Sequence, residues 1–429
     1  MKAWLRSTVF WMTVPVFVLA ALFIGLYLRL GSRNTQRSSL VWGSTPLLNN
    51  RHWSHAMRAA GYRSETFTTM YYGTINKRSD WDRILDEEWT GCPATLKPLL
   101  AFLDSLLRYD VFFISADGYF IGHTIGLWRL QAPLLRFCGK KTVFIPYGSD
   151  TYVYRRVRST ALLHGLLASY PEAAKRQAQV AARLDYWCRH ADACVPAVMG
   201  IDGFGRWDVL TTSPLCLDLN EWPASSRRSP ADGSTAPVVI CHAPNHRGFK
   251  GTEFVIDAVN QLKQEGLKVE LVLLEKIQND KVRQILQNDA DILIEQLIFT
   301  GHGLNGLEGM ASGIPVISNL EDEAYITPIR RWSFFSECPL VSASPETLVD
   351  VLRKLITRPQ LRHDIGRSSR AYVEKYHDLD SAAYLFEAVV DYVHKRRESL
   401  INLYHPILGE YPNRSAKIVS PLLNNKIVD

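Results

Sequence analysis

The chain has 429 residues, more than one hydrophobic core usually organises, so two domains are expected. Its composition of 47% hydrophobic and 21% charged residues excludes a disordered chain and is typical of a globular enzyme. The net charge of +6 is modest and no block of five or more Lys or Arg occurs, so no nucleic-acid partner is expected.

The amino-terminal segment predicts a membrane anchor. Residues 8–28 carry no charge, and about 21 helical residues span roughly 30 Å, the thickness of a bilayer's hydrocarbon core. Trp11 and Tyr27 lie near its ends, where aromatic rings favour the interface. A cleaved signal peptide is the alternative, but residues 26–29 offer no small-residue cleavage site. We expect a single transmembrane helix within an anchor and linker at residues 1–38.

The orientation of this helix stays open at the level of sequence. Lys2 and Arg6 flank one end, and Arg29, Arg33 and Arg37 flank the other. The positive-inside rule therefore gives a near tie.

Residues 39–222 alternate between predicted strands and helices. A strand at 40–42, a glycine turn at 43–46 and a helix at 50–60 form the opening unit of a nucleotide-binding α/β fold. Further strands are predicted at 111–114 and 142–145, each after an amphipathic helical stretch. This pattern predicts a first Rossmann-like domain built on a parallel sheet.

Residues 223–237 are rich in Pro, Ser, Gly and Ala and predict a linker. A second alternation follows over 238–378, and its helix at 252–264 has apolar residues at the 3.6-residue spacing of a core-facing helix. Residues 379–429 contain another amphipathic helix and a tail. The fold class predicted is therefore α/β, with two Rossmann-like domains.

Two segments of the second domain are candidates for binding a phosphorylated ligand. Arg247 and Lys250 stand just before a predicted helix start, where two cations and free amides could meet a diphosphate; a solvated basic turn is the alternative. Residues 300–318 are glycine-rich and lead into another helix, so their amides could approach an anion. Glu308, one turn into that helix, could accept hydrogen bonds from a ribose or could simply complement the helix dipole.

Together, Arg247, Lys250 and Gly251 with residues 301–317 resemble the donor-binding domain of retaining GT-B glycosyltransferases, family 4 in particular. The resemblance covers residues 40–400, more weakly in the first half. It implies two domains facing a central cleft, with Arg247 and Lys250 on the donor diphosphate and Glu308 on the ribose. The donor-binding residues implied are Gly43, Arg247, Lys250, Gly301, His302, Gly303 and Glu308.

This chain has Thr300 where the family usually has a further glutamate that touches the donor sugar. Sugar recognition and retention of configuration therefore stay open. Residues 290–297 resemble a subgroup that also lacks this glutamate.

In the first domain, implied to be the acceptor side, residues 43–46 resemble the family's glycine loop, and residues 139–150 resemble its GKK…GSD segment. Asp150 and His123 are the candidate catalytic residues. Asp150 could instead be a turn or capping residue. His123 lies just beyond a strand end, where such folds place ligands, although a lone histidine is often structural.

These features predict a glycosyltransferase that moves a sugar, such as a hexose, from a nucleoside-diphosphate sugar to a glycan or lipid-linked acceptor, in polysaccharide or glycolipid synthesis. Fixed positive groups would stabilise the leaving diphosphate, so we expect no metal and no cofactor besides the donor substrate. Two alternatives remain. A nucleotide-sugar epimerase would have no evident need of an anchor, and a non-catalytic scaffold of a glycan-assembly complex would be consistent with Thr300.

The seven cysteines form no CxxC pair, which excludes the usual zinc spacing and makes a disulfide framework unexpected. Nucleotide sugars are made in the cytosol. We therefore expect the catalytic domains on the cytoplasmic face of a membrane, with a Golgi-lumen enzyme as the alternative.

Overall fold

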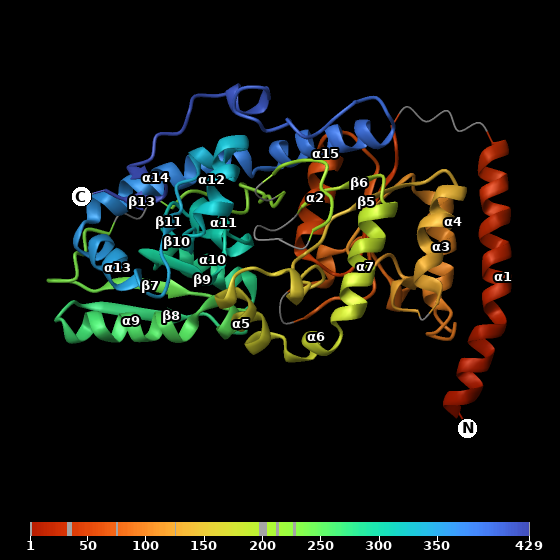
Figure 1. The fold of residues 1–429 in the computed structure, drawn as a ribbon, viewed down its shortest axis with the longest axis horizontal. Helices are drawn as coiled ribbons and strands as arrows, with labels where there is room; N and C mark the ends of the chain where they lie inside the picture. Colours follow the sequence, from red (N-terminus) through yellow and green to blue (C-terminus); the bar gives the residue numbers. More distant parts are fainter. Residues whose placement is uncertain are drawn as a thin grey trace.

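The computed structural model describes residues 2–31, 37–73, 76–124, 126–196, 204–211, 214–225 and 229–428, with side chains from residue 11 onward. Two sheets of parallel strands lie one after the other along the long axis of the molecule, and each is flanked by helices (Figure 1). This confirms the predicted α/β class with two Rossmann-like domains.

The first sheet has six strands in the order β3-β2-β1-β4-β5-β6, the doubly wound order in which the chain reverses between β1 and β4. Its strands are β1 (Leu40–Ser44), β2 (Ser64–Thr68), β3 (Arg83–Ile84), β4 (Val111–Ile114), β5 (Lys141–Phe144) and β6 (Ala193–Cys194). The helices of the first domain are α2 (Leu48–Ala59), α3 (Lys97–Arg108), α4 (Gln131–Phe137), α5 (Thr160–Ser169), α6 (Pro171–Lys175) and α7 (Gln177–His190).

Strand β1 is buried throughout because both faces of its sheet are covered. Leu40 and Trp42 belong to one hydrophobic core, whereas Val41 between them belongs to another. Successive side chains of a strand point to opposite faces, so the helices on each face bury alternate residues.

The second sheet has the order β11-β10-β9-β7-β8, which is 2-1-3-4-5 when read from its other edge and numbered within the domain. Its strands are β7 (Val238–His242), β8 (Val269–Leu273), β9 (Ile292–Thr300), β10 (Val316–Asn319) and β11 (Val341–Ser342). The helices are α8 (Arg247–Lys250), α9 (Thr252–Gln264), α10 (Asn279–Asn288), α11 (Leu304–Ala311), α12 (Glu323–Trp332), α13 (Leu348–Thr357) and α14 (Pro359–Tyr376).

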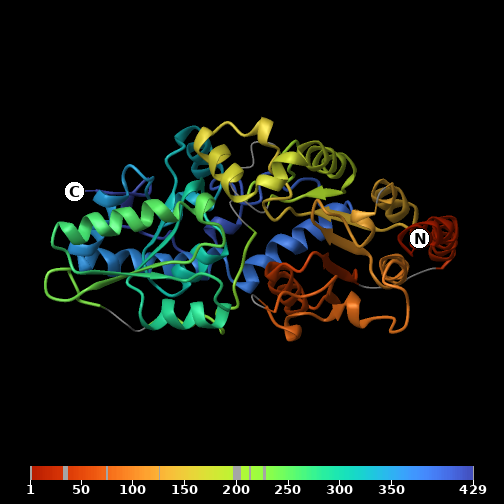
Figure 2. The ribbon, with the colours of Figure 1, turned by 90° about the horizontal axis from the view of Figure 1, so that it is seen from below.

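Helix α15 (Leu379–Val393) leaves the second domain and packs in the first, against α2 (Figure 2). The ring of Phe386 lies 4.9 Å from Trp42, 5.6 Å from Trp53 and 5.6 Å from Phe113, between ring centroids. The chain therefore crosses between the domains three times: through the segment before β7, at α15, and again in the tail after α15. The predicted linker, 223–237, lies between β6 and β7, and its residues 226–228 are outside the described part.

After α15 the tail returns to the second domain and ends in a hairpin of β12 (Leu422–Leu423) and β13 (Lys426–Ile427). Asn425, in the turn, donates hydrogen bonds to the carbonyls of Cys338 and Leu340 at 2.8 and 2.9 Å.

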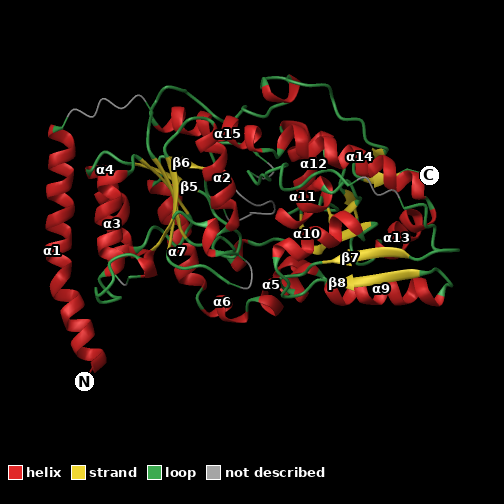
Figure 3. Cartoon of the chain, turned by 180° about the vertical axis from the view of Figure 1, so that it is seen from behind, coloured by secondary structure: helices red, strands yellow, loops and turns green. Residues whose placement is uncertain are grey.

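Helix α1 (Lys2–Leu30) lies at the outer edge of the first domain, alongside α3 and α4 (Figure 3). Its segment Trp11–Leu30 is long and apolar enough to cross a membrane, by length and composition alone. Arg33, used above for orientation, lies outside the described residues. All seven cysteines are free thiols, and only Cys92 is not buried.

Candidate active site in the cleft between the domains

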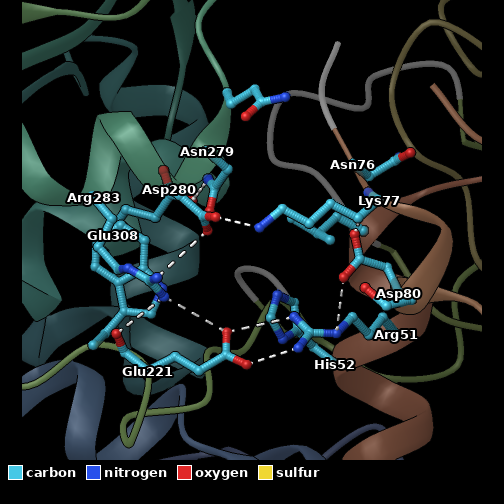
Figure 4. Close-up of a pocket in the computed structure, with 14 residues that line it drawn as sticks. Arg51, His52, Asn76, Lys77, Asp80, Glu221, Asn279, Asp280, Arg283 and Glu308 are labelled. Atoms are coloured by element: carbon cyan, nitrogen blue, oxygen red, sulfur yellow. Dashed lines mark hydrogen bonds and ion pairs between the residues drawn. The ribbon is translucent and has the colours of Figure 1, made fainter. Parts of the chain in front are cut away.

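A cavity of about 330 Å³ lies between the two domains, and we call it the inter-domain pocket (Figure 4). The first domain contributes Leu48, Arg51, His52, Asn76, Lys77, Ser79 and Asp80; the connecting segment contributes Glu221 and Trp222; the second domain contributes Gln278, Asn279, Asp280, Arg283 and Glu308. Pockets of this size, at the junction of two domains, are where small ligands usually bind.

Glu308 is the sequence-predicted residue that reaches this pocket. It is buried on α11, and its two carboxylate oxygens accept hydrogen bonds from the side-chain amides of Asn279, at 2.6 Å, and Asn305, at 3.1 Å. Burial raises the pKa of Glu308 to about 7, although the two amide hydrogen bonds oppose that rise. A ligand hydroxyl could take the place of either amide.

Charged side chains cross the pocket from one domain to the other. Lys77 of the first domain pairs with Asp280 on α10 of the second. Glu221, in the connecting segment, accepts a hydrogen bond of 2.7 Å from Arg51 and lies 3.9 Å from Arg283. Although burial disfavours its charged form, the Arg51 guanidinium lowers the pKa of the Glu221 carboxyl. Three cations therefore line a pocket that also holds the Glu308 carboxylate.

The amino end of α11 is the predicted anion site, and in this structure a protein carboxylate occupies it. The amide of Gly303 donates to Glu295 Oε1 at 2.6 Å, and Lys250 Nζ lies 3.4 Å from the same oxygen. A Cβ at Gly306 would come within 2.2 Å of Glu295 Oε2, so the glycine leaves room for this carboxylate. Glu295 is fully buried on β9.

Arg247 and Lys250 do not converge in this conformation. They lie within the short helix α8, which Gly251 (φ 77°) separates from α9. Lys250 turns inward and donates to the Gln296 side chain at 2.7 Å, whereas the more exposed Arg247 pairs with Glu253, at 2.7 Å, and with Glu275, at 2.8 Å.

The first domain covers α8 through α5. The amide of Phe249 on α8 donates to Ser169 Oγ at 2.9 Å. The rings of Tyr152 and Phe299, from the two domains, lie 5.7 Å apart in the same contact. Gly165 allows the close approach, because a Cβ there would come within 3.0 Å of Ile298.

A second cavity of about 550 Å³, the amino-terminal pocket, lies at the carboxyl ends of β4 and β5, and both His123 and Asp150 line it. His123 is exposed, with Nε2 3.9 Å from Asp117 Oδ1. Asp117 is the centre of the pocket's polar network, since it also contacts Arg183 at 3.1 Å and accepts from the Tyr147 hydroxyl at 2.8 Å.

Asp150 stabilises a turn in this structure by accepting hydrogen bonds from backbone amides. One carboxylate oxygen accepts from the amides of Tyr147 and Gly148, both at 2.9 Å, and the other accepts from the amide of Ala116 at 3.0 Å. These contacts join the ends of β4 and β5. Burial raises the pKa of Asp150 to about 7, despite the amide hydrogen bonds.

The remaining predicted donor-binding residues are Gly43, Gly301 and His302, and local packing or backbone conformation describes each of them. A Cβ at Gly43 would come within 2.1 Å of the Phe67 carbonyl, so the glycine permits the pairing of β1 with β2. Gly301 has φ 91°, and its carbonyl accepts from Gln296. His302 is buried beside Gly303, and burial lowers its pKa.

Sequence reasoning missed Glu295, Asp117 and Asn279. Glu295 could have been recognised from the sequence, because a charged residue inside an apolar strand indicates a buried group with a specific partner. Within the described residues, no group of three or more His, Cys, Asp or Glu side chains could hold a metal ion. Asp80 lines the inter-domain pocket, and Asp82 is separated from it by one residue. The Asp82 carboxylate does not face the pocket with Asp80, because it accepts hydrogen bonds from the Thr66 amide and the Arg58 guanidinium.

No protein-family model matches the chain, and no curated protein matches it. Among solved structures it is similar to sucrose-phosphate synthase from Thermosynechococcus elongatus, at 13% identity over 84% of this chain and 100% of that chain, with a TM-score of 0.48. A putative UDP-N-acetylglucosamine 2-epimerase from Listeria monocytogenes has 11% identity over 85% and 98%, with a TM-score of 0.45. MurG from Acinetobacter baumannii has 13% identity over 84% and 100%, with a TM-score of 0.39.

At these identities and scores, the neighbours do not assign an activity to this chain. The strand orders above establish its fold, two doubly wound α/β domains with the inter-domain pocket at their junction.

Proposed function

We propose that the chain is a glycosyltransferase that transfers a sugar from a nucleoside-diphosphate sugar to a glycan or lipid-linked acceptor. The observation that carries this proposal is the inter-domain pocket, which sets the Glu308 carboxylate at one wall and Arg51, Lys77 and Arg283 around it. A carboxylate suits two ribose hydroxyls, and cations suit phosphates. Both domains supply these groups, so a bound donor would hold the cleft together.

The two pockets divide the proposed substrates. The donor nucleoside would bind against Glu308, with its diphosphate directed toward Lys250 and the start of α11. The acceptor would enter the amino-terminal pocket, where the exposed His123 could receive the proton of the attacking hydroxyl. Arg247 is exposed, and its ion pairs with Glu253 and Glu275 lie at the surface, so turning toward a phosphate would cost little.

Transfer breaks the bond between the sugar's anomeric carbon and the diphosphate, so negative charge develops on the leaving group. Lys250, and Arg247 once it has turned toward the phosphate, would stabilise that charge without a metal ion. Retention by front-face attack is the outcome implied by the family resemblance, and we propose it on that ground.

Replacing Arg247 by Ala tests the proposal. We expect kcat/KM for sugar transfer to fall about a hundredfold, because one cation that would stabilise the leaving diphosphate is lost, with an unchanged Tm. Arg353→Ala is the matched control, because Arg353 on α13 is a similarly exposed arginine that bridges Asp350 on the same helix and Glu265 at the end of α9. Full turnover by the Arg247→Ala enzyme would reject the assignment.

Incubation with the donor alone separates the alternatives. An epimerase converts the donor sugar without an acceptor, whereas a transferase requires one. The buried Glu295 at the start of α11 is the observation that favours a non-catalytic scaffold, since a carboxylate there competes with a phosphate. Nucleotide binding without transfer to any of a broad panel of membrane-extracted acceptors would support the scaffold.

We also propose that α1 anchors the enzyme at a membrane, with both α/β domains on the cytosolic side. Cytosolic synthesis of nucleotide sugars and the seven free thiols support this side. Protease digestion of sealed vesicles of known orientation tests it, since only domains on the outer face are cleaved.

A further inference from the structure

Helix α1 has one face that is fixed to the first domain. Phe17, Ala21, Gly25 and Arg29 recur every fourth residue and so form a single stripe along the helix. The Phe17 ring lies 5.8 Å from the ring of Phe102 on α3.

The other three residues of this stripe contact the end of α4. The Ala21 carbonyl accepts from the Cys138 thiol at 3.5 Å, and Arg29 Nε donates to the Phe137 carbonyl at 2.9 Å. A Cβ at Gly25 would come within 2.5 Å of the Phe137 ring, so only glycine fits. The contact thus extends from Phe17 to Arg29.

The opposite face of α1 is apolar and uncovered. Its exposed residues are spaced by three or four and form a second stripe: Met12, Val16, Leu19, Phe23, Leu26 and Leu30. Their exposed fractions run from 50% for Leu26 to 88% for Leu30. An exposed apolar row of this length marks an interaction surface. No charged side chain interrupts residues 11–28, so the row offers nothing polar to specify a protein partner.

While α1 is docked in this way, it cannot cross a bilayer. Helices α3 and α4 lie beside it, and they carry Asp104, Arg108 and Arg136. A spanning α1 would carry these charged groups to the depth of the hydrocarbon, which is strongly unfavourable. A helix lying in the plane of the membrane surface immerses only its outer face.

If α1 left the first domain to enter lipid, the free energy that it gained would be small compared with the cost of uncovering the domain surface. Lipid tails are about as apolar as the protein surface that α1 already covers, so its inner stripe gains little from entering lipid. The faces of Phe102, Phe137 and Cys138 would meanwhile lose their cover and meet water.

We infer that α1 lies in the plane of a lipid bilayer, with the Met12–Leu30 stripe in the acyl chains and the opposite stripe still docked on α3 and α4. The first domain is then seated on the membrane as a rigid unit. A Cβ at Gly126 would lie 3.5 Å from the ring of Trp11, which places the amino-terminal half of α1 near the segment that carries His123. If the proposed function holds, this arrangement keeps the acceptor pocket close to lipid-linked substrates.

Vesicle sedimentation of the full chain tests the lipid-facing stripe. We expect wild-type protein to pellet with vesicles of phosphatidylcholine and phosphatidylglycerol, and Leu19→Glu/Phe23→Glu to reduce the bound fraction about tenfold or more. Ile407→Glu/Leu408→Glu, in the exposed carboxyl-terminal tail, is the matched control and should bind as wild type. Vesicle binding by the α1 double variant, or a wild-type chain that dimerises through α1 and ignores vesicles, would overturn the inference.

Accessibility of the two termini separates an in-plane helix from a spanning one. With protein bound to sealed vesicles, an impermeant protease should remove an amino-terminal and a carboxyl-terminal tag equally. Protection of the amino-terminal tag would mean that α1 spans the bilayer and would contradict the inference.

A substitution at Gly25 tests whether α1 stays docked on α3 and α4 when the protein is bound to a membrane. Gly25→Leu would clash with Phe137, and Phe23→Leu on the outer stripe is the control. We expect hydrogen exchange in α3 and α4 of vesicle-bound protein to accelerate only in Gly25→Leu. Equal exchange in wild type and Gly25→Leu would show that α1 leaves the domain in lipid. Thermal shift with nucleoside diphosphates on the same samples reports donor binding separately, so failure of the proposed function and failure of this inference are distinguishable.

Discussion

At the residue scale, Glu308 combines deep burial with a carboxylate. Its pKa of about 7 lies above the ordinary value of 4.5, so the folded chain holds a proton there that the unfolded chain releases. Stability contributed by this group is therefore present at low pH and is lost as the pH rises from about 4.5 through 7. Asp150, with a pKa also raised to about 7, contributes in the same direction.

Glu308→Gln should remove this part of the pH dependence. We expect the difference in unfolding free energy between pH 5 and pH 8 to shrink by up to about 3 kcal/mol relative to wild type. The buried Asn305 Oδ1, which has no hydrogen-bond partner among the described residues, could accept from the new amide after a flip. Urea unfolding at both pH values measures the effect, and identical pH profiles would refute the raised pKa.

Glu295 offers a second prediction at this scale. Glu295→Gln keeps the acceptor for the Gly303 amide but removes the negative charge beside Lys250. We expect nucleoside diphosphates to bind about threefold to tenfold more tightly, because the buried charge no longer repels a phosphate. Calorimetric titration gives Kd, with Glu270→Gln, exposed on β8, as the control. Weaker binding would instead make the Glu295 carboxylate part of the donor site.

At the scale of elements, the seam between α5 and α8 sets the position of Arg247 and Lys250. Gly165→Leu would push α5 away from Ile298 and Phe249, and overpacking of this kind costs about 1–3 kcal/mol. We expect a lower Tm and weaker nucleotide binding, since α8 shifts with the seam. Ala161→Leu, on the exposed side of α5, should leave both unchanged. Full nucleotide affinity in Gly165→Leu would show that the seam is irrelevant to the donor site.

At the scale of the whole molecule, α15 makes the first domain depend on the carboxyl-terminal part of the chain. Phe386 fills a site between Trp42, Trp53 and Phe113, so Phe386→Ala should destabilise the protein by about 3–5 kcal/mol. Tryptophan fluorescence during denaturation reports this core directly. Phe254→Ala, an exposed phenylalanine on α9, serves as the control. Equal effects of the two substitutions would show that α15 is dispensable for the first domain.

The sequence alone determined the α/β class and most strand positions, because hydrophobic periodicity is a property of each short segment and can be recognised without knowing which other segments it contacts. The strands predicted at 111–114 and 142–145 correspond to β4 and β5. The apolar length of α1 and the glycine-rich entry to α11 were readable for the same reason.

Only the tertiary structure decided how distant residues combine. It turned Arg247 toward Glu275 and Lys250 toward Glu295, brought His123 and Asp150 to one pocket, and placed α15 in the first domain. It also gave α1 a docked face and an open one. Charge pairing and helix docking depend on which chain segments meet in space, and periodicity along one segment carries no information about its partner.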